Sequence, residues 1–416
     1  MPPEVTPMDD DFRIDELIYD WNALHNPPKP RRIELSDETL RDGLQSPSIT
    51  DPPLEKKRQA LHYMHALGIP NANIAMPTGP RTKAEAIELA REIAQQRLKI
   101  HPNCAARTVV ADVQAIIDVS QAAGIPVEVS TFIGSSAIRK LAEGWDLDQM
   151  RRNVEQAVTL GVKHQLPVMF VTEDTTRAHP DTLRQLYRTA IECGAYRITL
   201  ADTVGHSTPH GVKNLVRFIR EDVLAPYPHI KVDWHGHNDR GLALANALAA
   251  LEAGVDCVHG TILGIGERVG NTSLDQLLVN LKLLGWWEND LSKLPEYCQL
   301  VAEHCGAPLP FNYPVFGRDA FRTSTGVHAA AVIKAKQKGD DFLANRIYSA
   351  VPAELFGRHQ EIEIGPASGH HNVEYWLKAH QIAPSPALVQ ALLERAKQAR
   401  SVLSESEILQ IVKAHT

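Results

Sequence analysis

The feature of this chain that most constrains its fold is a repeated alternation of short apolar segments with longer segments of helical periodicity. The expected strand and helix pairs are RRIEL with 54–67, NANIAM with 82–97, 99–105 with 111–123, PVEVSTF with 147–164, PVMFV with 180–192, YRITLAD with 209–222, HIKVDWH with 241–253 and DCVHGT with 273–285. Eight units of this kind over about 250 residues are typical of a (β/α)8 TIM barrel. We therefore predict an α/β fold of this class.

Two flanking segments depart from the alternation. The first 30 residues end in the proline-rich sequence HNPPKP, which indicates an N-terminal arm. Beyond residue 290 the rhythm breaks, and helical patterns return at 385–399 and 404–414. The predicted organisation is an arm at 1–30, a catalytic barrel at 31–290 and C-terminal helical subdomains at 291–416.

Composition excludes several classes of function. The 416 residues carry a net charge of -7 with no basic stripe, so a nucleic acid partner is not expected. No run of about 18 apolar residues and no secretory signal are found, so a membrane span is not expected either. The five cysteines form no C-x-x-C pair, which favours a reducing, cytoplasmic setting over a disulfide framework or a cysteine zinc site.

Two histidines, His235 and His237, stand at the end of the seventh expected strand. Because successive side chains on a strand point to opposite faces, the two imidazoles project together. Enzymes with this fold place their chemistry at the ends of the strands. The pair is therefore a candidate metal clamp, although two surface histidines at a strand end would fit the same pattern.

Polar side chains recur at the ends of other expected strands. The first strand ends in DETLRDGLQ, the fifth in TED, the sixth in DTVG and the eighth in GIGERVGN. For the first string, a capped helix start with a surface ion pair is the alternative interpretation. The glycines of the last string do not have G-x-G-x-x-G spacing, so a dinucleotide loop is not predicted.

These strings together resemble the acyl-CoA-condensing branch of the DRE-TIM metallolyase superfamily. The branch contains 2-isopropylmalate synthase, homocitrate synthase and citramalate synthase. The resemblance rests on SDETLRDGLQ, VTEDTTR, ADTVGHSTP, HGHND and GIGERVGN in this order, and it extends to GRDAFRTSTGVHAA, which is similar to the family's first C-terminal subdomain. It implies a metal-dependent Claisen condensation of acetyl-CoA with a 2-oxo acid, followed by hydrolysis of the thioester.

The resemblance also implies a metal site. Its ligands would be Asp42, His235 and His237, with Asn271 as a further ligand or close neighbour. Two neutral imidazoles and oxygen donors suit Mg²⁺, Mn²⁺ or Zn²⁺, and open coordination positions could take the carboxylate and keto oxygens of the 2-oxo acid.

Four catalytic residues are carried over from the family pattern. Arg41 would stabilise the developing alkoxide, and Glu173 would remove the methyl proton of acetyl-CoA. His328 would assist Glu173, and Tyr348 would help to position the hydrolytic water. In the family this extension covers the partner's barrel in a homodimer, so the two residues could act in cis or in trans. A purely structural His and Tyr is the alternative.

Substrate selectivity is expected to depend on the walls of the site. Gln45 and Thr203 match residues near the oxo acid, while Met169 stands where homocitrate synthases have an arginine for the distal carboxylate. Arg139 replaces a usual histidine, and Asn73 replaces a glutamate that we expect in the pocket wall. Since an unpaired second carboxylate is costly to bury, the pattern favours a small apolar oxo acid such as 2-oxoisovalerate or pyruvate.

Other functions stay open on sequence grounds. Ala330 replaces an aspartate near the catalytic histidine, which raises the possibility of a non-catalytic relative. A 3-hydroxy-3-methylglutaryl-CoA lyase-like activity is disfavoured because such lyases have a cysteine in the loop that here reads GIGER. We expect a role in amino-acid, specifically leucine, biosynthesis and no leucine-binding regulatory domain.

Overall fold

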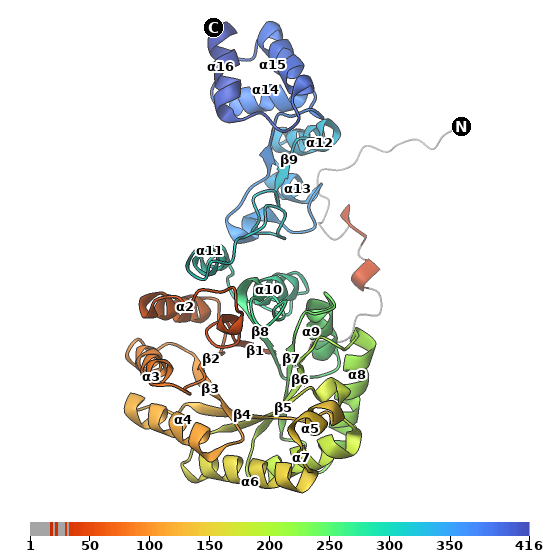
Figure 1. Ribbon diagram of the computed structural model, residues 1–416. Helices are drawn as coiled ribbons and strands as arrows, with labels where there is room; N and C mark the ends of the chain where they lie inside the picture. Colours follow the sequence, from red (N-terminus) through yellow and green to blue (C-terminus); the bar gives the residue numbers. More distant parts are fainter. Residues whose placement is uncertain (1–16, 20, 24–29, 31–32, 416) are drawn as a thin grey trace, which may run out of the picture.

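Eight parallel strands close into a barrel in the computed structural model, which describes residues 17–19, 21–23, 30 and 33–415 (Figure 1). The strands are β1 (Glu34–Asp37), β2 (Asn71–Ala75), β3 (His101–Arg107), β4 (Glu128–Gly134), β5 (Val168–Glu173), β6 (Arg197–Asp202), β7 (Lys231–Gly236) and β8 (Cys257–Gly260). Strand β1 closes the barrel by pairing with β8, with Ser36 opposite His259. The predicted TIM barrel is confirmed. The arm expected at 1–30 falls largely outside the described residues.

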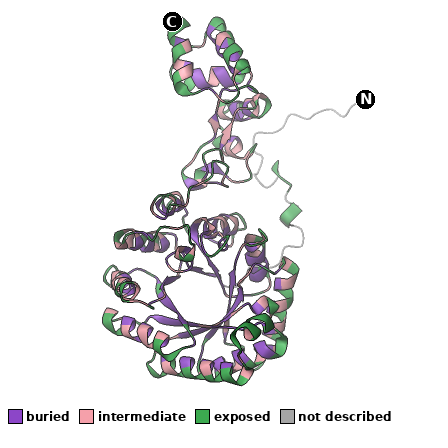
Figure 2. Ribbon diagram, in the orientation of Figure 1, coloured by how far each residue is buried: buried purple, intermediate pink, exposed green. Residues whose placement is uncertain are grey.

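Helices surround the barrel and follow the strands in chain order. They are α2 (Leu54–Ala66), α3 (Pro80–Gln95), α4 (Val110–Ala123), α5 (Ala137–Glu143), α6 (Leu147–Lys163), α7 (Pro180–Glu192), α8 (Pro209–Phe218), α9 (Ala243–Glu252) and α10 (Leu274–Leu283). Apart from α5, which has no buried residue, their buried faces turn towards the strands and their exposed faces turn outward (Figure 2). This arrangement follows from the helical spacing of their apolar residues.

The apolar core lies between the strands and the helices. Side chains on the outward face of the strands, such as Leu35, Phe170, Ile198 and Trp234, are fully buried beneath the helix layer. The alternate, inward positions of the same strands carry many polar and charged groups. The interior of the barrel therefore differs from the branched apolar filling that is usual in this fold.

Within the barrel, helix α5 was not predicted. The loop after β4 contains α5, which begins after Ser136, whose hydroxyl accepts a hydrogen bond from the Arg139 amide. It ends at Gly144, where φ is 68°. A helix of seven residues spans only two turns, too short for its periodicity to stand out in the sequence. This short helix presents Arg139 at the barrel mouth.

The C-terminal region is largely helical, as predicted. It comprises α11 (Leu294–His304), α12 (Gly326–Gln337), α13 (Asp341–Arg346), α14 (His370–Ala379), α15 (Pro386–Gln398) and α16 (Glu405–His415). Helix α11 packs against α2, whereas α14 to α16 have an apolar cluster of their own. A two-stranded sheet of β9 (Arg322–Thr323) and β10 (Glu361–Ile362) was not predicted. In Figure 1 the segment from α12 to α16 extends to one side of the barrel. No helix among the described residues is long and apolar enough to cross a membrane.

Candidate active site

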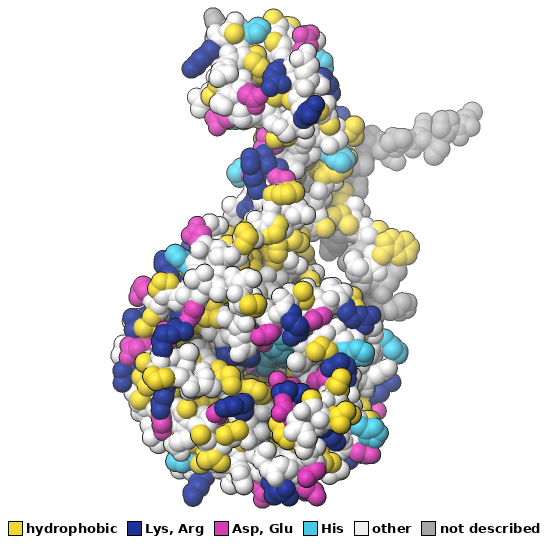
Figure 3. Space-filling model, viewed as in Figure 1, with side chains coloured by type: hydrophobic (Ala, Val, Ile, Leu, Met, Phe, Trp, Pro, Cys, Tyr) yellow, Lys and Arg dark blue, Asp and Glu magenta, His cyan; other side chains and the backbone are white. Residues whose placement is uncertain are grey.

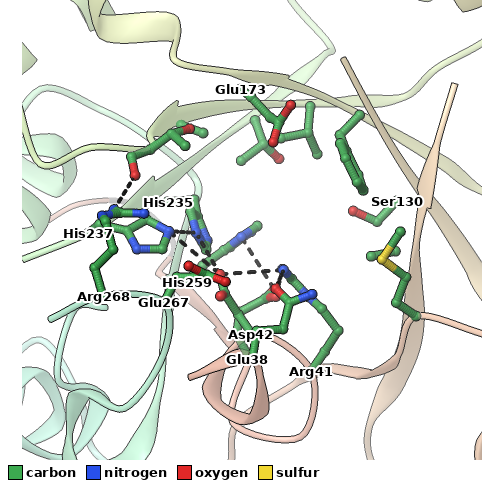
Figure 4. Close-up of a pocket in the computed structure, with 18 residues that line it drawn as sticks. Glu38, Arg41, Asp42, Ser130, Glu173, His235, His237, His259, Glu267 and Arg268 are labelled. Carbon is green, nitrogen blue, oxygen red and sulfur yellow. Dashed lines mark hydrogen bonds and ion pairs between the residues drawn. The ribbon is translucent and has the colours of Figure 1, made fainter. Parts of the chain in front are cut away.

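A cavity of about 410 Å³ opens at the carboxyl ends of the strands. Histidine side chains are visible in its depth in Figure 3, and Figure 4 shows its polar residues from β1, β7 and the loop after β8 facing Ser130. The lining residues are Glu38, Arg41, Asp42, Gln45, Met76, Ala105, Ser130, Phe132, Val171, Glu173, Thr199, Ala201, Thr203, His235, His237, His259, Glu267 and Arg268. Its size is in the range of small-molecule sites.

Three potential metal ligands converge at one end of this cavity. Asp42 follows β1, and His235 and His237 come from the end of β7. The Nε2 atoms of the two histidines lie 3.2 Å apart, and Asp42 Oδ2 lies 3.1 Å from that of His235 and 3.7 Å from that of His237. Strand alternation therefore does bring the two imidazoles together, and closure of the barrel adds the carboxylate.

The protonation states of these groups suit metal binding. Burial alone would raise the pKa of Asp42, but Arg41 and the two histidines reverse this effect and hold the pKa well below its usual range. Burial, reinforced by the neighbouring His235, lowers the pKa of His237 to about 4. At neutral pH Asp42 is thus a carboxylate and His237 a neutral imidazole, the forms that bind a cation.

Asn271 supplies a fourth donor beside the three ligands. It is paired with His237 through an isolated antiparallel bridge, and its buried Oδ1 has no hydrogen-bond partner among the described residues. The preceding Gly270 has φ 91°, and a Cβ there would lie 1.8 Å from the Gly264 carbonyl oxygen. The loop therefore requires glycine at 270 to present Asn271. An orphaned amide oxygen, a carboxylate and two imidazoles fit a divalent metal.

A second buried group, formed by Asp233, Cys257 and His259, is less suited to a metal. The Arg197 guanidinium donates to Asp233 Oδ2 at 2.9 Å, and His259 Nε2 contacts the same oxygen at 3.1 Å. Burial raises the pKa of the Cys257 thiol well above its usual value. Since a guanidinium already neutralises the carboxylate and the thiol keeps its proton, this group is better described as part of an ion-pair network.

Arg41 lies beside the metal ligands. Its Nη2 donates to the Glu38 carboxylate, and its Nη1 lies 3.4 Å from Asp42 Oδ2 and 3.5 Å from Gln45 Oε1. Gln45 is exposed at the cavity rim, in a 3-10 turn (Gly43–Gln45). The guanidinium therefore faces the region in which an oxo acid on the metal would lie.

Glu173 ends β5 on another side of the cavity. Burial raises the pKa of Glu173. Arg139 and, to a smaller extent, Arg41 lower this pKa, whereas Asp174 raises it further. The Nη2 of Arg139 lies 4.0 Å from Glu173 Oε2, while its Nη1 pairs with Glu143 at 2.7 Å. Arg139 does not line the cavity, so its contact with the site passes through Glu173. A carboxyl with a raised pKa is suited to proton transfer near neutral pH.

Thr203, just after β6, is the remaining cavity residue that was expected from sequence. Its hydroxyl accepts a hydrogen bond from the Asp174 amide at 2.8 Å. Its hydroxyl proton can still be donated. The side chain is therefore able to bind a carboxylate oxygen in the cavity.

Other expected residues lie elsewhere. Met169 is buried on the inward face of β5, two positions below Val171, and does not line the cavity. The expectation that Asn73 lies in the pocket wall is wrong. Its side chain is buried opposite Asn103 in the barrel interior, and neither of its polar atoms has a partner among the described residues. A register shift in β2 after Asn73 places Met76, rather than Asn73, at the rim.

His328 and Tyr348 lie together but outside the cavity. Their rings are 4.1 Å apart between centroids, and both side chains are exposed on the C-terminal region. Ala330, on the same helix α12, is half-buried. Within one chain these residues do not reach the other candidate catalytic groups.

Several cavity residues were not singled out from the sequence. Glu38, Ser130, Thr199 and His259 occupy inward positions of β1, β4, β6 and β8 or directly follow them. Thr199 alternates with apolar outward residues, so the period of two marks it as inward-facing, whereas Glu38 stands between the polar residues Asp37 and Thr39. Nothing in that pattern distinguishes inward residues near the mouth from those deeper in the barrel.

Comparison with known proteins identifies the family. A family model described as HMGL-like matches residues 32–301. The chain belongs to the HMGL-like family. Homocitrate synthase AksA of Methanopyrus kandleri, a similar protein, is 31% identical over 401 residues, with 95% of each chain covered. A probable 2-isopropylmalate synthase of the same organism is 32% identical over 375 residues, covering 89% of this chain and 70% of the relative. The predicted membership of the acyl-CoA-condensing DRE-TIM branch is confirmed.

Solved structures of other proteins share the fold. The HMG-CoA lyase of Bacillus subtilis superimposes with a TM-score of 0.58 at 20% identity, over 68% of this chain and 97% of the lyase. An HMG-CoA lyase of Acinetobacter baumannii in complex with coenzyme A and 3-methylmalate gives a TM-score of 0.55 at 20% identity, over 67% and 94% of the two chains. At this identity the likeness establishes the barrel architecture alone.

The metal site is testable by substitution. His235→Ala or His237→Ala should weaken Mn²⁺ binding by more than about tenfold, because each removes a ligand, while the melting temperature of the metal-free protein stays close to that of the wild type. Calorimetric titration measures the affinity. His206→Ala, at an exposed histidine of the same rim, is the matched control. Unchanged Mn²⁺ affinity in both ligand variants would contradict the assignment.

Proposed function

We propose that the protein catalyses the metal-dependent condensation of acetyl-CoA with a small apolar 2-oxo acid and then hydrolyses the thioester, as a 2-isopropylmalate synthase does. Support for the reaction type comes from the family and from the relatives named as synthases. Support for the substrate comes from the cavity wall opposite the metal ligands. A place in leucine biosynthesis is part of this proposal.

The apolar wall is the observation that carries the choice of substrate. Met76, Ala105, Phe132 and Val171 line the side of the cavity formed by β2 to β5. An alkyl side chain of the oxo acid would be removed from water against this surface, and burial of such groups is favourable by about 25 cal/mol per Å². The wall therefore supports 2-oxoisovalerate or pyruvate as the substrate.

The lining arginines are already paired with carboxylates. Arg41 donates to Glu38, and Arg268 makes two hydrogen bonds to Asp239 at 2.8 and 2.9 Å. In Figure 4 Arg268 lies beside His237 and Arg41 lies beside Asp42. A second carboxylate against the apolar wall would thus find no unpaired arginine among the lining residues, and its desolvation would oppose binding. This argues against 2-oxoglutarate.

The proposed roles of the residues follow from their positions. When bound, the metal would polarise the keto group of the oxo acid. Thr203 would donate to the substrate carboxylate, and Arg41 would stabilise the negative charge that develops on the keto oxygen. Glu173 would accept a methyl proton from acetyl-CoA, whose methyl carbon then forms a bond to the keto carbon. Hydrolysis of the thioester by water would release CoA.

We place His328 and Tyr348 in the site of a second copy of the chain. Both side chains are exposed, and Val327 beside them is 74% exposed. None of these residues lines the cavity of its own chain. A homodimer in which this surface covers the partner's barrel would complete the catalytic set and bury these side chains. His328 would then assist proton transfer, and Tyr348 would position the hydrolytic water.

A second candidate is a homocitrate synthase-like reaction. Its support is the similarity to AksA, which covers 95% of this chain. This reaction requires a cation for the distal carboxylate. Met169, at the position where homocitrate synthases are expected to have an arginine for that role, is apolar and buried. A lyase-like activity has support only at the level of the fold.

A screen for CoA release tests the proposal. Metal-free protein would receive Mg²⁺, Mn²⁺ or Zn²⁺, then acetyl-CoA with 2-oxoisovalerate, pyruvate or 2-oxoglutarate, and free thiol would be measured. We expect kcat/KM for one of the apolar acids to exceed that for 2-oxoglutarate by at least about tenfold. Preference for 2-oxoglutarate would contradict the substrate choice. A metal-loaded protein that releases no CoA with any acid would contradict the reaction.

The pH dependence of kcat/KM tests Glu173 as the base. It must be deprotonated to accept the methyl proton, and Arg139 lowers its pKa. Arg139→Gln removes this charge and raises the pKa, so the acidic limb of the profile should move to higher pH while activity on the alkaline side is retained. Arg152→Gln, at an exposed arginine on α6, is the control. A limb that does not move, or moves to lower pH, would rule out this pairing.

Subunit complementation tests the shared site. The single variants Glu173→Gln and His328→Ala should each have very low activity. A heterodimer has one intact pair of these residues if they act across subunits, so random mixing should restore about one quarter of wild-type activity. Mixtures that stay inactive, although exchange of subunits is shown by mass spectrometry, would indicate that the residues do not act in trans.

A further inference from the structure

A chain of buried charged groups runs along the interior of the barrel from the cavity. Arg41 donates to Glu38, whose Oε1 lies 3.4 Å from His259 Nδ1. The other ring nitrogen of His259 lies 3.1 Å from Asp233 Oδ2. Glu38, His259 and Asp233 are each less than 5% exposed. The Arg41 guanidinium is thus connected directly to Glu38 and, through His259, to Asp233.

The same chain continues to the opposite mouth of the barrel. Arg197 bridges Asp233 and Glu34 at 2.9 and 2.6 Å, and Lys231 pairs with Glu34 at 2.8 Å. These last residues line a separate depression at the amino ends of the strands. Asp233 is therefore anchored from below by a buried arginine, and it in turn orients the imidazole of His259.

Stability alone does not account for this network. Barrels of this class usually fill their interior with branched apolar residues. Desolvation of paired charges commonly cancels their mutual attraction, so a buried network of this kind is no better for stability than apolar packing. The network is better explained by the orientation that it imposes on Arg41, the group at its cavity end.

Glu38 is held in a way that fixes Arg41. Its carboxylate receives hydrogen bonds from Arg41 and from Ser36 Oγ, the latter at 3.3 Å, and it faces His259. The same guanidinium lies 3.4 Å from Asp42 Oδ2, an oxygen that a metal would use. Without Glu38, Arg41 would be free to turn fully towards Asp42 and to compete with a cation there.

We propose that Glu38 and His259 are positioning residues, which hold the Arg41 guanidinium over the cavity and keep it from neutralising Asp42. This role rests on the proposed function insofar as Arg41 acts on the 2-oxo acid. Its second consequence, protection of the Asp42 carboxylate for metal binding, depends only on the geometry of the site. Asp233 and Arg197 support the role by orienting His259.

The test compares two buried carboxyls on one strand. Glu38→Gln removes the inward charge and retains an acceptor oxygen, and Asp37→Asn makes the same change at the preceding residue, whose carboxylate accepts hydrogen bonds from Thr39 and Tyr297 instead. We expect Glu38→Gln to weaken Mn²⁺ binding about 10 to 100-fold in calorimetric titrations, and Asp37→Asn to leave it within about twofold. Equal Mn²⁺ affinities in the two variants would overturn the proposal.

Kinetics provide the second readout. For Glu38→Gln saturated with Mn²⁺, kcat with 2-oxoisovalerate should fall at least about tenfold, and His259→Gln should fall in the same direction by less. If Glu38→Gln does not fold, Mn²⁺ affinity and kcat are measured for His259→Gln instead. Wild-type values of both in His259→Gln would refute the positioning role. If the wild type releases no CoA, the proposed function fails, while the Mn²⁺ measurement still judges the positioning role.

Discussion

Pairing of β1 with β8 is the constraint on which the site depends. It joins the first strand to the last through four residue pairs, from Glu34 opposite Cys257 to Asp37 opposite Gly260. Because closure fixes the end of β1 beside the ends of β7 and β8, Asp42 meets two histidines that are nearly 200 residues later in the chain. Asp42 directly precedes the short turn that begins at Gly43, and the glycine-rich loop after β8 adds Asn271. The convergence of these potential ligands is thus a consequence of barrel closure.

Electrostatic balance within the closed barrel determines what the cavity can bind. Asp42 is shared between two histidines and Arg41, and Arg41 is shared between Asp42 and Glu38. Buried charges of opposite sign therefore restrain one another at the polar end of the cavity. At the other end, Met76, Phe132 and Val171 offer only apolar contact. The two ends together support the proposed substrate, which has one carboxylate, a keto group and an alkyl chain.

Local periodicity predicts the fold and the pair of histidines, whereas Asp42, Arg41 and Asn271 were expected only from the family resemblance. Alternation on β7 placed His235 and His237 on one face, and the structure agrees. Depth along a strand is a tertiary property, which is why Asn73 was wrongly expected in the pocket wall and Met169 was expected near the substrate. The Glu38–His259 contact joins two strands that are far apart in sequence, so no local pattern could reveal it.

In the proposed reaction, a 2-oxo acid binds to a metal held by Asp42, His235 and His237. Water proton relaxation in a solution of the Mn²⁺-loaded protein measures this directly, because Mn²⁺ relaxes the protons of its exchangeable bound waters. We expect 2-oxoisovalerate to lower the relaxation rate in a saturable manner, because its oxygens displace those waters, and 2-oxoglutarate to require much higher concentrations. A relaxation rate that 2-oxoisovalerate does not change, or that 2-oxoglutarate lowers first, would contradict this expectation.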